Sequence, residues 1–84
     1  MIRKALIDPK VKHQSIGGKE IIIEREMTIG DILDGDVDMS IALYNFMVRR
    51  EDFFTLDYDL KVYYGHVGFL GYFVAEDEII EWLD

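Results

Sequence analysis

The 84-residue sequence contains no cysteine and a single proline, Pro9. The missing thiols exclude disulfide bonds and thiolate metal sites, and a small domain without such cross-links fits a reducing cytoplasm, where we expect the protein. The sequence also has no apolar run near the roughly 20 residues of a membrane span, and its start lacks the apolar stretch of a signal peptide. Stability must therefore come from an apolar core, and half of the residues are hydrophobic.

Basic residues are also scarce: nine Lys and Arg stand against seventeen Asp and Glu, which gives a net charge of −8. Residues 1–26 carry six basic and four acidic side chains, whereas residues 27–84 carry three basic and thirteen acidic ones. Nucleic acids and anionic membranes are bound through Lys and Arg, so we expect neither as a direct partner. The sequence predicts one domain, 1–84, with a basic N-terminal arm at 1–26 and an acidic body whose partner is a basic protein.

Two pairs of strands are indicated by β-branched runs and by alternation of polar and apolar residues. Residues 2–7 and 19–25 are predicted to pair as a loose hairpin. Strands at 58–64 and 69–74 are predicted to flank a turn at 65–68, and Gly71 indicates a bulge or a close approach. In the strand at 58–64, four alternating residues are expected to face the core: Tyr58, Leu60, Val62 and Tyr64.

Two short helices are predicted from capping and charge. Thr28 is typical of an N-cap and Asp31 stands three residues on, so we expect a helix at 29–34 that ends at Gly35. A second helix is expected at 76–83, because acidic residues precede an apolar face there.

The segment at 36–50 fits two patterns. Its alternation favours a strand at 37–48, and its spacing of Met39, Ala42, Leu43 and Phe46 fits a helix as the alternative. With the strand reading, the sequence predicts an α+β fold: a mostly antiparallel sheet of four or five strands with two short helices.

Three aspartates have the spacing of the first ligands in a calcium-binding loop, namely Asp34, Asp36 and Asp38. The loop would need glycine where Met39 stands and glutamate where Asn45 stands. We therefore expect no metal site, and a weak divalent-metal binder remains an alternative. These acids are instead expected at a helix end, a turn and a solvated strand face.

Catalytic patterns are equally incomplete. Asp57 and Asp59 share a strand face and could serve as an acid and a base. The sequence has no serine elbow, no P-loop and no zinc-type histidine spacing, since His13 and His66 stand far apart. We therefore expect no enzyme and no cofactor. Tyr63 is expected near the surface beside Asp57 and Asp59, and tyrosine set among carboxylates is typical of a protein-binding surface.

Acidic residues recur over several elements of the body, at Asp31, Asp34, Asp36, Asp38, Glu51, Asp52, Asp57, Asp59, Glu76, Asp77, Glu78 and Glu81. In charge, size and class the chain resembles small inhibitors encoded by phages and other mobile elements, among them anti-CRISPR proteins and DNA mimics. The resemblance implies an inhibitor that blocks the nucleic-acid-binding groove of a basic partner such as a CRISPR effector. The residues expected to bind this partner are Asp31, Asp34, Asp36, Asp38, Asp57, Asp59, Tyr63, Glu76 and Asp77.

The alternative function is a self-associating structural or assembly protein. In such a homo-oligomer, the basic arm of one copy would meet the acidic body of another, or edge strands would pair.

Overall fold

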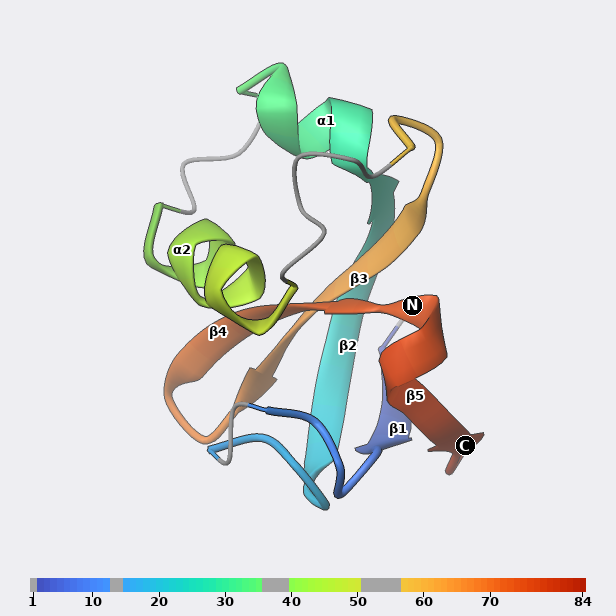
Figure 1. Ribbon diagram of the computed structural model, residues 1–84. Helices are drawn as coiled ribbons and strands as arrows, with labels where there is room; N and C mark the ends of the chain where they lie inside the picture. Colours follow the sequence, from blue (N-terminus) through green and yellow to red (C-terminus); the bar gives the residue numbers. More distant parts are fainter. Residues whose placement is uncertain (1, 13–14, 36–39, 51–56) are drawn as a thin grey trace.

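A computed structural model describes residues 2–12, 15–35, 40–50 and 57–84. Its elements are β1 (Arg3–Ile7), β2 (Glu20–Thr28), α1 (Ile29–Leu33), α2 (Ser40–Arg49), β3 (Lys61–Val67), β4 (Leu70–Ala75), the 3₁₀ turn η2 (Glu76–Glu78) and β5 (Ile79–Trp82). In this part of the chain the strands form one antiparallel sheet in the order β4-β3-β2-β1-β5. The expected α+β class, with an antiparallel sheet and two helices, is confirmed (Figure 1).

The basic N-terminal segment lies inside the sheet. β1 and β2 pair as the predicted hairpin, with Ala5 opposite Ile21, and β2 is the central strand. The pairing of β2 with β3 shifts register between Ile23 and Arg25, and that of β1 with β5 shifts between Leu6 and Ile7. Gly71 pairs with His66 in regular register, so the bulge expected there is wrong. The N-terminal residues therefore supply the middle of the fold.

The hairpin of β3 and β4 is longer than predicted. Gly65, His66 and Val67 belong to β3, so the turn expected at 65–68 is wrong for these three residues; the chain reverses at Gly68, where φ is +63°. The close approach expected at Gly71 is confirmed, because a Cβ there would collide with the hydroxyl of Tyr64. Any larger residue at position 71 would displace the Tyr64 ring from its place in the helix-side core.

The strand expected at 37–48 is wrong over residues 40–48, where the chain forms helix α2; residues 37–39 lie outside the described residues. Packing decides in favour of the helix. Ala42 and Phe46 are buried on its inner side and contact the core cluster over β4. Residues i and i+4 lie on one face of a helix, so both side chains reach the core, whereas Ile41, which strand alternation would have turned inward with Leu43, is exposed.

The helix expected at 76–83 is also wrong. A single 3₁₀ turn over Glu76–Glu78 is followed by β5, which pairs with β1 so that Trp82 lies opposite Ala5. Tertiary pairing explains the difference, because the otherwise open edge of β1 gains a hydrogen-bonded neighbour. None of the helices in the described ranges is long and apolar enough to cross a membrane.

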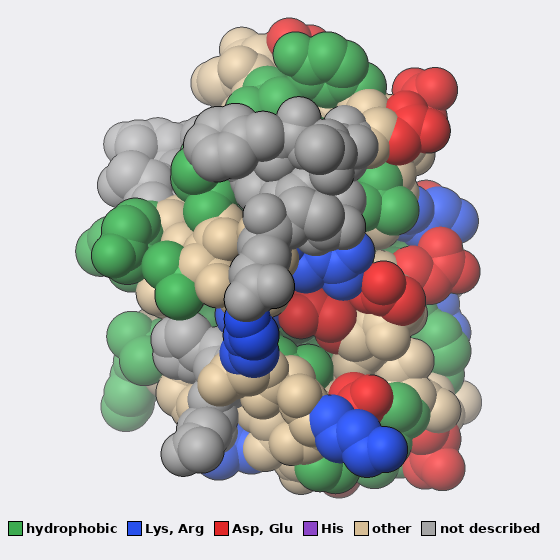
Figure 2. Space-filling view, in the orientation of Figure 1, with side chains coloured by type: hydrophobic (Ala, Val, Ile, Leu, Met, Phe, Trp, Pro, Cys, Tyr) green, Lys and Arg blue, Asp and Glu red, His purple; other side chains and the backbone are tan. Residues whose placement is uncertain are grey.

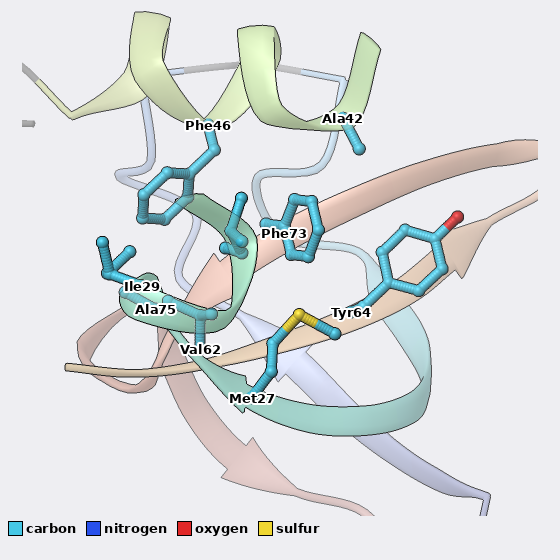
Figure 3. Packing of buried hydrophobic residues seen from close by; sticks show 9 residues of the cluster. Met27, Ile29, Ala42, Phe46, Val62, Tyr64, Phe73 and Ala75 are labelled. Carbon is cyan, nitrogen blue, oxygen red and sulfur yellow. The ribbon is translucent and has the colours of Figure 1, made fainter. Parts of the chain in front are cut away.

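Both faces of the sheet are covered by apolar clusters. On the helix side, residues from α1, α2 and the sheet form a cluster that includes Phe46, Val62, Tyr64 and Phe73 (Figure 3). On the other side, the second cluster joins strand residues to Ile16 of the β1–β2 connection. The strand at 58–64 was expected to bury only one of its faces. In the structure, neighbouring residues of β3 and β4 are buried on opposite faces of the sheet, so both faces of these strands are buried.

Candidate protein-binding surface

Helix α1 and the turn at 57–60 are joined by backbone hydrogen bonds. The N–H of Ile29 donates to the carbonyl of Leu60 at 3.0 Å, and the N–H of Gly30 donates to the carbonyl of Tyr58 at 2.9 Å. The first donors of a helix have no partner within the helix, so this turn satisfies two of them. Two segments about 30 residues apart in the sequence thus form one end of the molecule.

Four aspartates occupy this end, and the side chains of two of them, Asp31 and Asp57, accept local hydrogen bonds from backbone N–H groups. Thr28 and Asp31 form the predicted capping box: the Thr28 Oγ1 accepts from the Asp31 N–H at 3.2 Å, and the Asp31 Oδ2 accepts from the Thr28 N–H at 2.9 Å. Asp34 is the C-cap of α1. In the turn, the Asp57 Oδ1 accepts from the Asp59 N–H at 2.9 Å.

All four of these residues are exposed. We call the four residues the acidic end: Asp31, Asp34, Asp57 and Asp59. Figure 2 shows red and green side chains side by side at the top of the molecule, over α1 and the neighbouring turn. The structure therefore brings together four of the nine residues expected to bind a partner.

Two apolar side chains are exposed at the acidic end. Tyr58 exposes 64% of its surface and Leu33 46%. The prediction that Tyr58 faces the core is wrong, because β3 begins only at Lys61 and Tyr58 lies in the preceding turn. Of the other three residues expected to face inward, Val62 and Tyr64 are buried and Leu60 packs against the helix-side cluster. The exposed ring of Tyr58 takes the place that the sequence assigned to Tyr63.

Tyr63 itself is buried in the second core cluster, so its predicted surface position is wrong. Its ring meets that of Trp82 edge-on, with centroids 5.1 Å apart. Burial raises the pKa of the Tyr63 hydroxyl, and the nearby Lys61 ammonium partly offsets this rise in pKa. Tyr63 is therefore a core residue on the far side of the sheet from α1.

Asp36 and Asp38, and with them most of the incomplete calcium-loop pattern, lie outside the described residues. Within the described ranges, no group of three or more histidine or carboxylate side chains is placed to hold a metal ion. The aspartates of the acidic end are spread along a helix and a turn.

Glu76 and Asp77 belong to a different surface, the turn between β4 and β5. The Asp77 Oδ1 lies 2.7 Å from the Arg50 Nη1. The Glu26 carboxylate, 3.5 Å from the Lys61 ammonium, is the main cause of the raised pKa of Lys61. Glu76 contributes to the same rise in pKa, so it lies near Lys61. The structure therefore separates these two predicted partner-binding residues from α1.

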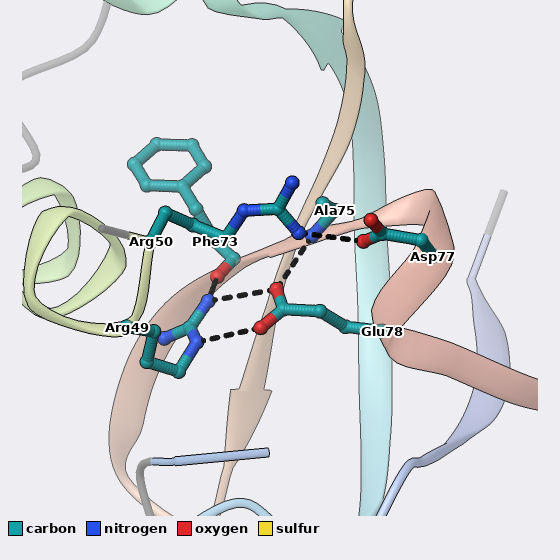
Figure 4. Close-up of polar contacts among 6 residues, drawn as sticks. All are labelled: Arg49, Arg50, Phe73, Ala75, Asp77 and Glu78. Atoms are coloured by element: carbon teal, nitrogen blue, oxygen red, sulfur yellow. Dashed lines mark hydrogen bonds and ion pairs between the residues drawn. The ribbon is translucent and has the colours of Figure 1, made fainter. Parts of the chain in front are cut away.

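The third acid of this run, Glu78, is buried and ion-paired. Its carboxylate accepts from the Arg49 Nε at 3.0 Å and from the Arg49 Nη2 at 3.2 Å, and the two residues are 7% and 5% exposed. Figure 4 shows this pair beside that of Arg50 and Asp77. We call these residues the ion-pair corner: Arg49, Arg50, Asp77 and Glu78.

The buried pair also covers part of the outer edge of β4. Arg49 Nη2 donates to the carbonyl of Phe73, and the Ala75 N–H donates to the Glu78 Oε1 at 2.9 Å. Both backbone groups would otherwise be open to pairing with a foreign strand. The corner borders a shallow hollow of about 420 Å³, which is lined on its other side by Asp8, Lys10, Val11 and Lys12.

A second chain of polar contacts joins β2 to β3. The His66 Nδ1 lies 3.2 Å from the Glu24 Oε1, and the His66 Nε2 lies 3.3 Å from the Tyr64 hydroxyl. Tyr64 is buried in the helix-side cluster beneath Gly71. These contacts of Glu24, His66 and Tyr64 therefore link β2 to β3.

Comparison of the chain with protein-family models, with curated proteins and with solved structures finds no match.

Proposed function

We propose that the protein is a small acidic protein–protein interaction module whose acidic end binds a basic, nucleic-acid-binding surface of a partner protein. In biological terms it acts as a mobile-element inhibitor that blocks a nucleic-acid-binding groove, such as that of a CRISPR effector. The observation that carries the proposal is the gathering of four exposed carboxylates around exposed Tyr58 and Leu33 on α1 and the adjoining turn.

Carboxylates can replace phosphates as acceptors for Lys and Arg, because both offer charged oxygens to the same donors. At the acidic end, the hydrogen bonds of Asp31 and Asp57 to backbone N–H groups hold the side chains in place before a partner arrives. Pre-organised groups lose less side-chain entropy on binding. The local caps thus favour a fixed pattern of negative charge.

Tyr58 and Leu33 supply the apolar part of the contact. Charged groups mainly steer and orient a complex, whereas affinity comes from a few well-buried side chains, among which tyrosine is common. A contact centred on Tyr58 and rimmed by aspartates combines both. Because the rim is exposed, salt should weaken the complex by slowing association.

The proposal is tested with two variants that lose the same number of negative charges at opposite ends of the molecule. The acidic-end variant carries Asp34→Asn, Asp57→Asn and Asp59→Asn. The control variant carries Asp8→Asn, Glu20→Gln and Glu81→Gln, near the β1–β2 connection and in β5 (Figure 1). Asparagine keeps the side-chain oxygen that accepts a backbone N–H at positions 57 and 8.

Each protein is immobilised and exposed to a nuclease-treated bacterial lysate over a range of salt concentrations. We expect the wild type and the control variant to retain a basic nucleic-acid-binding protein that added DNA or RNA displaces, and the acidic-end variant to lose it. Equal retention by both variants, or a complex in which the partner still binds nucleic acid, would contradict the proposal.

A further inference from the structure

A second exposed surface lies on helix α2 and the tip of the β3–β4 hairpin. Ile41, Tyr44 and Val48 on α2, and Phe69 and Leu70 at the hairpin tip, each expose more than half of their surface. We call these five residues the apolar face. Figure 2 shows green side chains along the left edge of the molecule, over α2 and below it. Isolated apolar residues on a surface are ordinary, but a group of this kind marks an interaction site.

The fold itself does not require the apolar face. Helix α2 already turns Ala42, Phe46 and Arg49 toward the sheet. Ile41, Tyr44 and Val48 follow the i, i+3, i+7 spacing of a second stripe on its outer side, where a surface helix is normally polar. A helix that is apolar on two sides is expected to be covered on both.

Strand pairing is restricted beside the apolar face. Arg49 and Glu78 occupy the outward carbonyl of Phe73 and the outward N–H of Ala75. A strand added to this edge of β4 would have to break that buried pair. The occupant of the apolar face is therefore better placed to pack side chains against α2 than to extend the sheet.

We propose that the occupant is a second copy of this chain, packed through α2 about a twofold axis near Tyr44. In such a dimer the same surface serves both copies, so that Tyr44 meets its own counterpart and Ile41 meets Val48 of the other copy. The a/d-like spacing of the three residues suits antiparallel helix packing. Phe69 and Leu70 flank the contact from the hairpin tip.

Size and charge both favour this occupant. Phe69 is fully exposed and the other four residues expose between 54% and 74% of their surface, so together they offer several hundred Å², the same order of magnitude as the ~800 Å² per partner of a standard interface. The face itself contains no charged residue, so a complementary partner surface is also uncharged and apolar, as a second copy's own face is. The acidic end lies on α1, outside the contact, and stays available for a partner.

The dimer and the acidic-end complex respond to salt in opposite ways. Two copies with a net charge of −8 each repel one another, so added salt should strengthen an apolar dimer. A complex with a basic partner should weaken instead. Failure of one proposal can thus be recognised without reference to the other.

The test is sedimentation equilibrium of the full chain over a concentration series at low and high salt. We expect a dimer whose dissociation constant falls as salt is added. In Tyr44→Lys the dissociation constant should rise by roughly thirtyfold or more, because a tyrosine at the centre of the interface is lost. Leu33→Lys, at the acidic end, serves as the matched control and should leave the dimer intact. A wild type that is monomeric at the highest concentration, or a dimer unchanged by Tyr44→Lys, would overturn the proposal.

A second readout uses the absence of native cysteine. Tyr44→Cys should form a disulfide-linked dimer on mild oxidation, because residues on the twofold axis approach within the roughly 7 Å between Cα atoms that a disulfide needs. Leu33→Cys should stay monomeric at the same concentration. Equal cross-linking of the two variants would contradict the twofold arrangement. If the wild type forms no dimer and Tyr44→Lys no longer captures the partner from the lysate, the apolar face binds that partner instead.

Discussion

The acidic end and the ion-pair corner both carry carboxylates, and they differ in the burial and in the partners of these carboxylates. The four aspartates of the acidic end are exposed, and the carboxylates of Asp31 and Asp57 accept hydrogen bonds from nearby backbone N–H groups. In the corner, Arg49 and Glu78 are almost fully buried, bonded to each other and to the edge of β4. Charge at the acidic end is therefore available to a partner, whereas charge in the corner holds α2 and the β4–β5 turn together.

The acidic runs of the sequence do not all contribute to one binding surface, although Glu76 and Asp77 were expected to bind the partner together with the aspartates of the acidic end. Glu76, Asp77 and Glu78 are adjacent in the sequence, yet Glu78 is buried, Asp77 pairs with Arg50 and Glu76 lies near Lys61. Negative charge alone does not tell which side chains face a partner. The partners that each carboxylate already has must be known first.

Breaking the buried pair is expected to give the largest effect. Glu78→Leu leaves the Arg49 guanidinium buried without its carboxylate, which should lower the free energy of unfolding by about 3–5 kcal/mol. Urea denaturation measures the loss. The double variant Arg49→Met with Glu78→Leu should recover much of it, because no charge is then left unpaired. A loss below about 1 kcal/mol in the single variant would show that the pair is solvated like a surface pair.

Removing the N-cap of α1 is expected to have an intermediate effect. Thr28→Ala leaves the Asp31 N–H without its side-chain acceptor and should cost about 1 kcal/mol. Thr28→Ser keeps the acceptor and is the matched control in the same urea titration. Equal stability of the two variants would mean that the capping box does not hold the acidic end in place.

Neutralising the acidic end should change stability very little. For Asp34→Asn, Asp57→Asn and Asp59→Asn together, we expect a change within about ±0.5 kcal/mol, because the side chains are exposed, Asp34 caps α1 through its backbone N–H, and asparagine keeps the acceptor oxygen at position 57. Thermal and urea unfolding of the variant test this point. A loss of several kcal/mol would show that these carboxylates are structural, as those of the corner are.

The exposed pair of Arg3 and Asp84 should give the smallest effect. Its atoms lie 2.8 Å apart, and the hydrogen bond from Arg3 lowers the pKa of the Asp84 carboxyl. Because the pKa of Asp84 is lower in the folded state than in the unfolded state, the pair stabilises the fold at pH values above the unfolded pKa. This stabilisation is lost as the pH falls through the pKa of the folded state. In urea titrations, Asp84→Asn should therefore be slightly less stable than wild type at pH 7 and indistinguishable from it in strong acid.

Local signals in the sequence were sufficient for α1 and for the existence of the two hairpins, but not for the bounds of β3 and of the turn that follows it. Thr28 and Asp31 satisfy each other within one helical turn, so the capping box needs no distant contact to be recognised. The alternation around Lys61–Tyr64 likewise marks a strand. The capped helix placed Asp31 and Asp34 correctly at one exposed end, although nothing in the sequence indicated that the 57–60 turn would adjoin them.

Elements decided by distant contacts were not predictable in the same way. Helix α2 is apolar on two sides, so Ile41 and Leu43 imitate strand alternation even though Ala42 and Phe46 pack as a helix. The segment at 79–82 has a helix-like apolar pattern and becomes β5 because β1 offers an edge. Tyr63 was misplaced because the second core cluster, which buries it, is formed by strands far away in the sequence.

The most direct test of the acidic end as the binding surface is the dissociation constant of the captured partner for the two charge-matched variants. Isothermal titration at physiological salt compares Asp34→Asn/Asp57→Asn/Asp59→Asn with Asp8→Asn/Glu20→Gln/Glu81→Gln. We expect the first to bind on the order of tenfold or more weakly than wild type and the second to bind almost unchanged. Equal weakening of both variants would mean that only net charge matters, and it would contradict a defined surface at the acidic end.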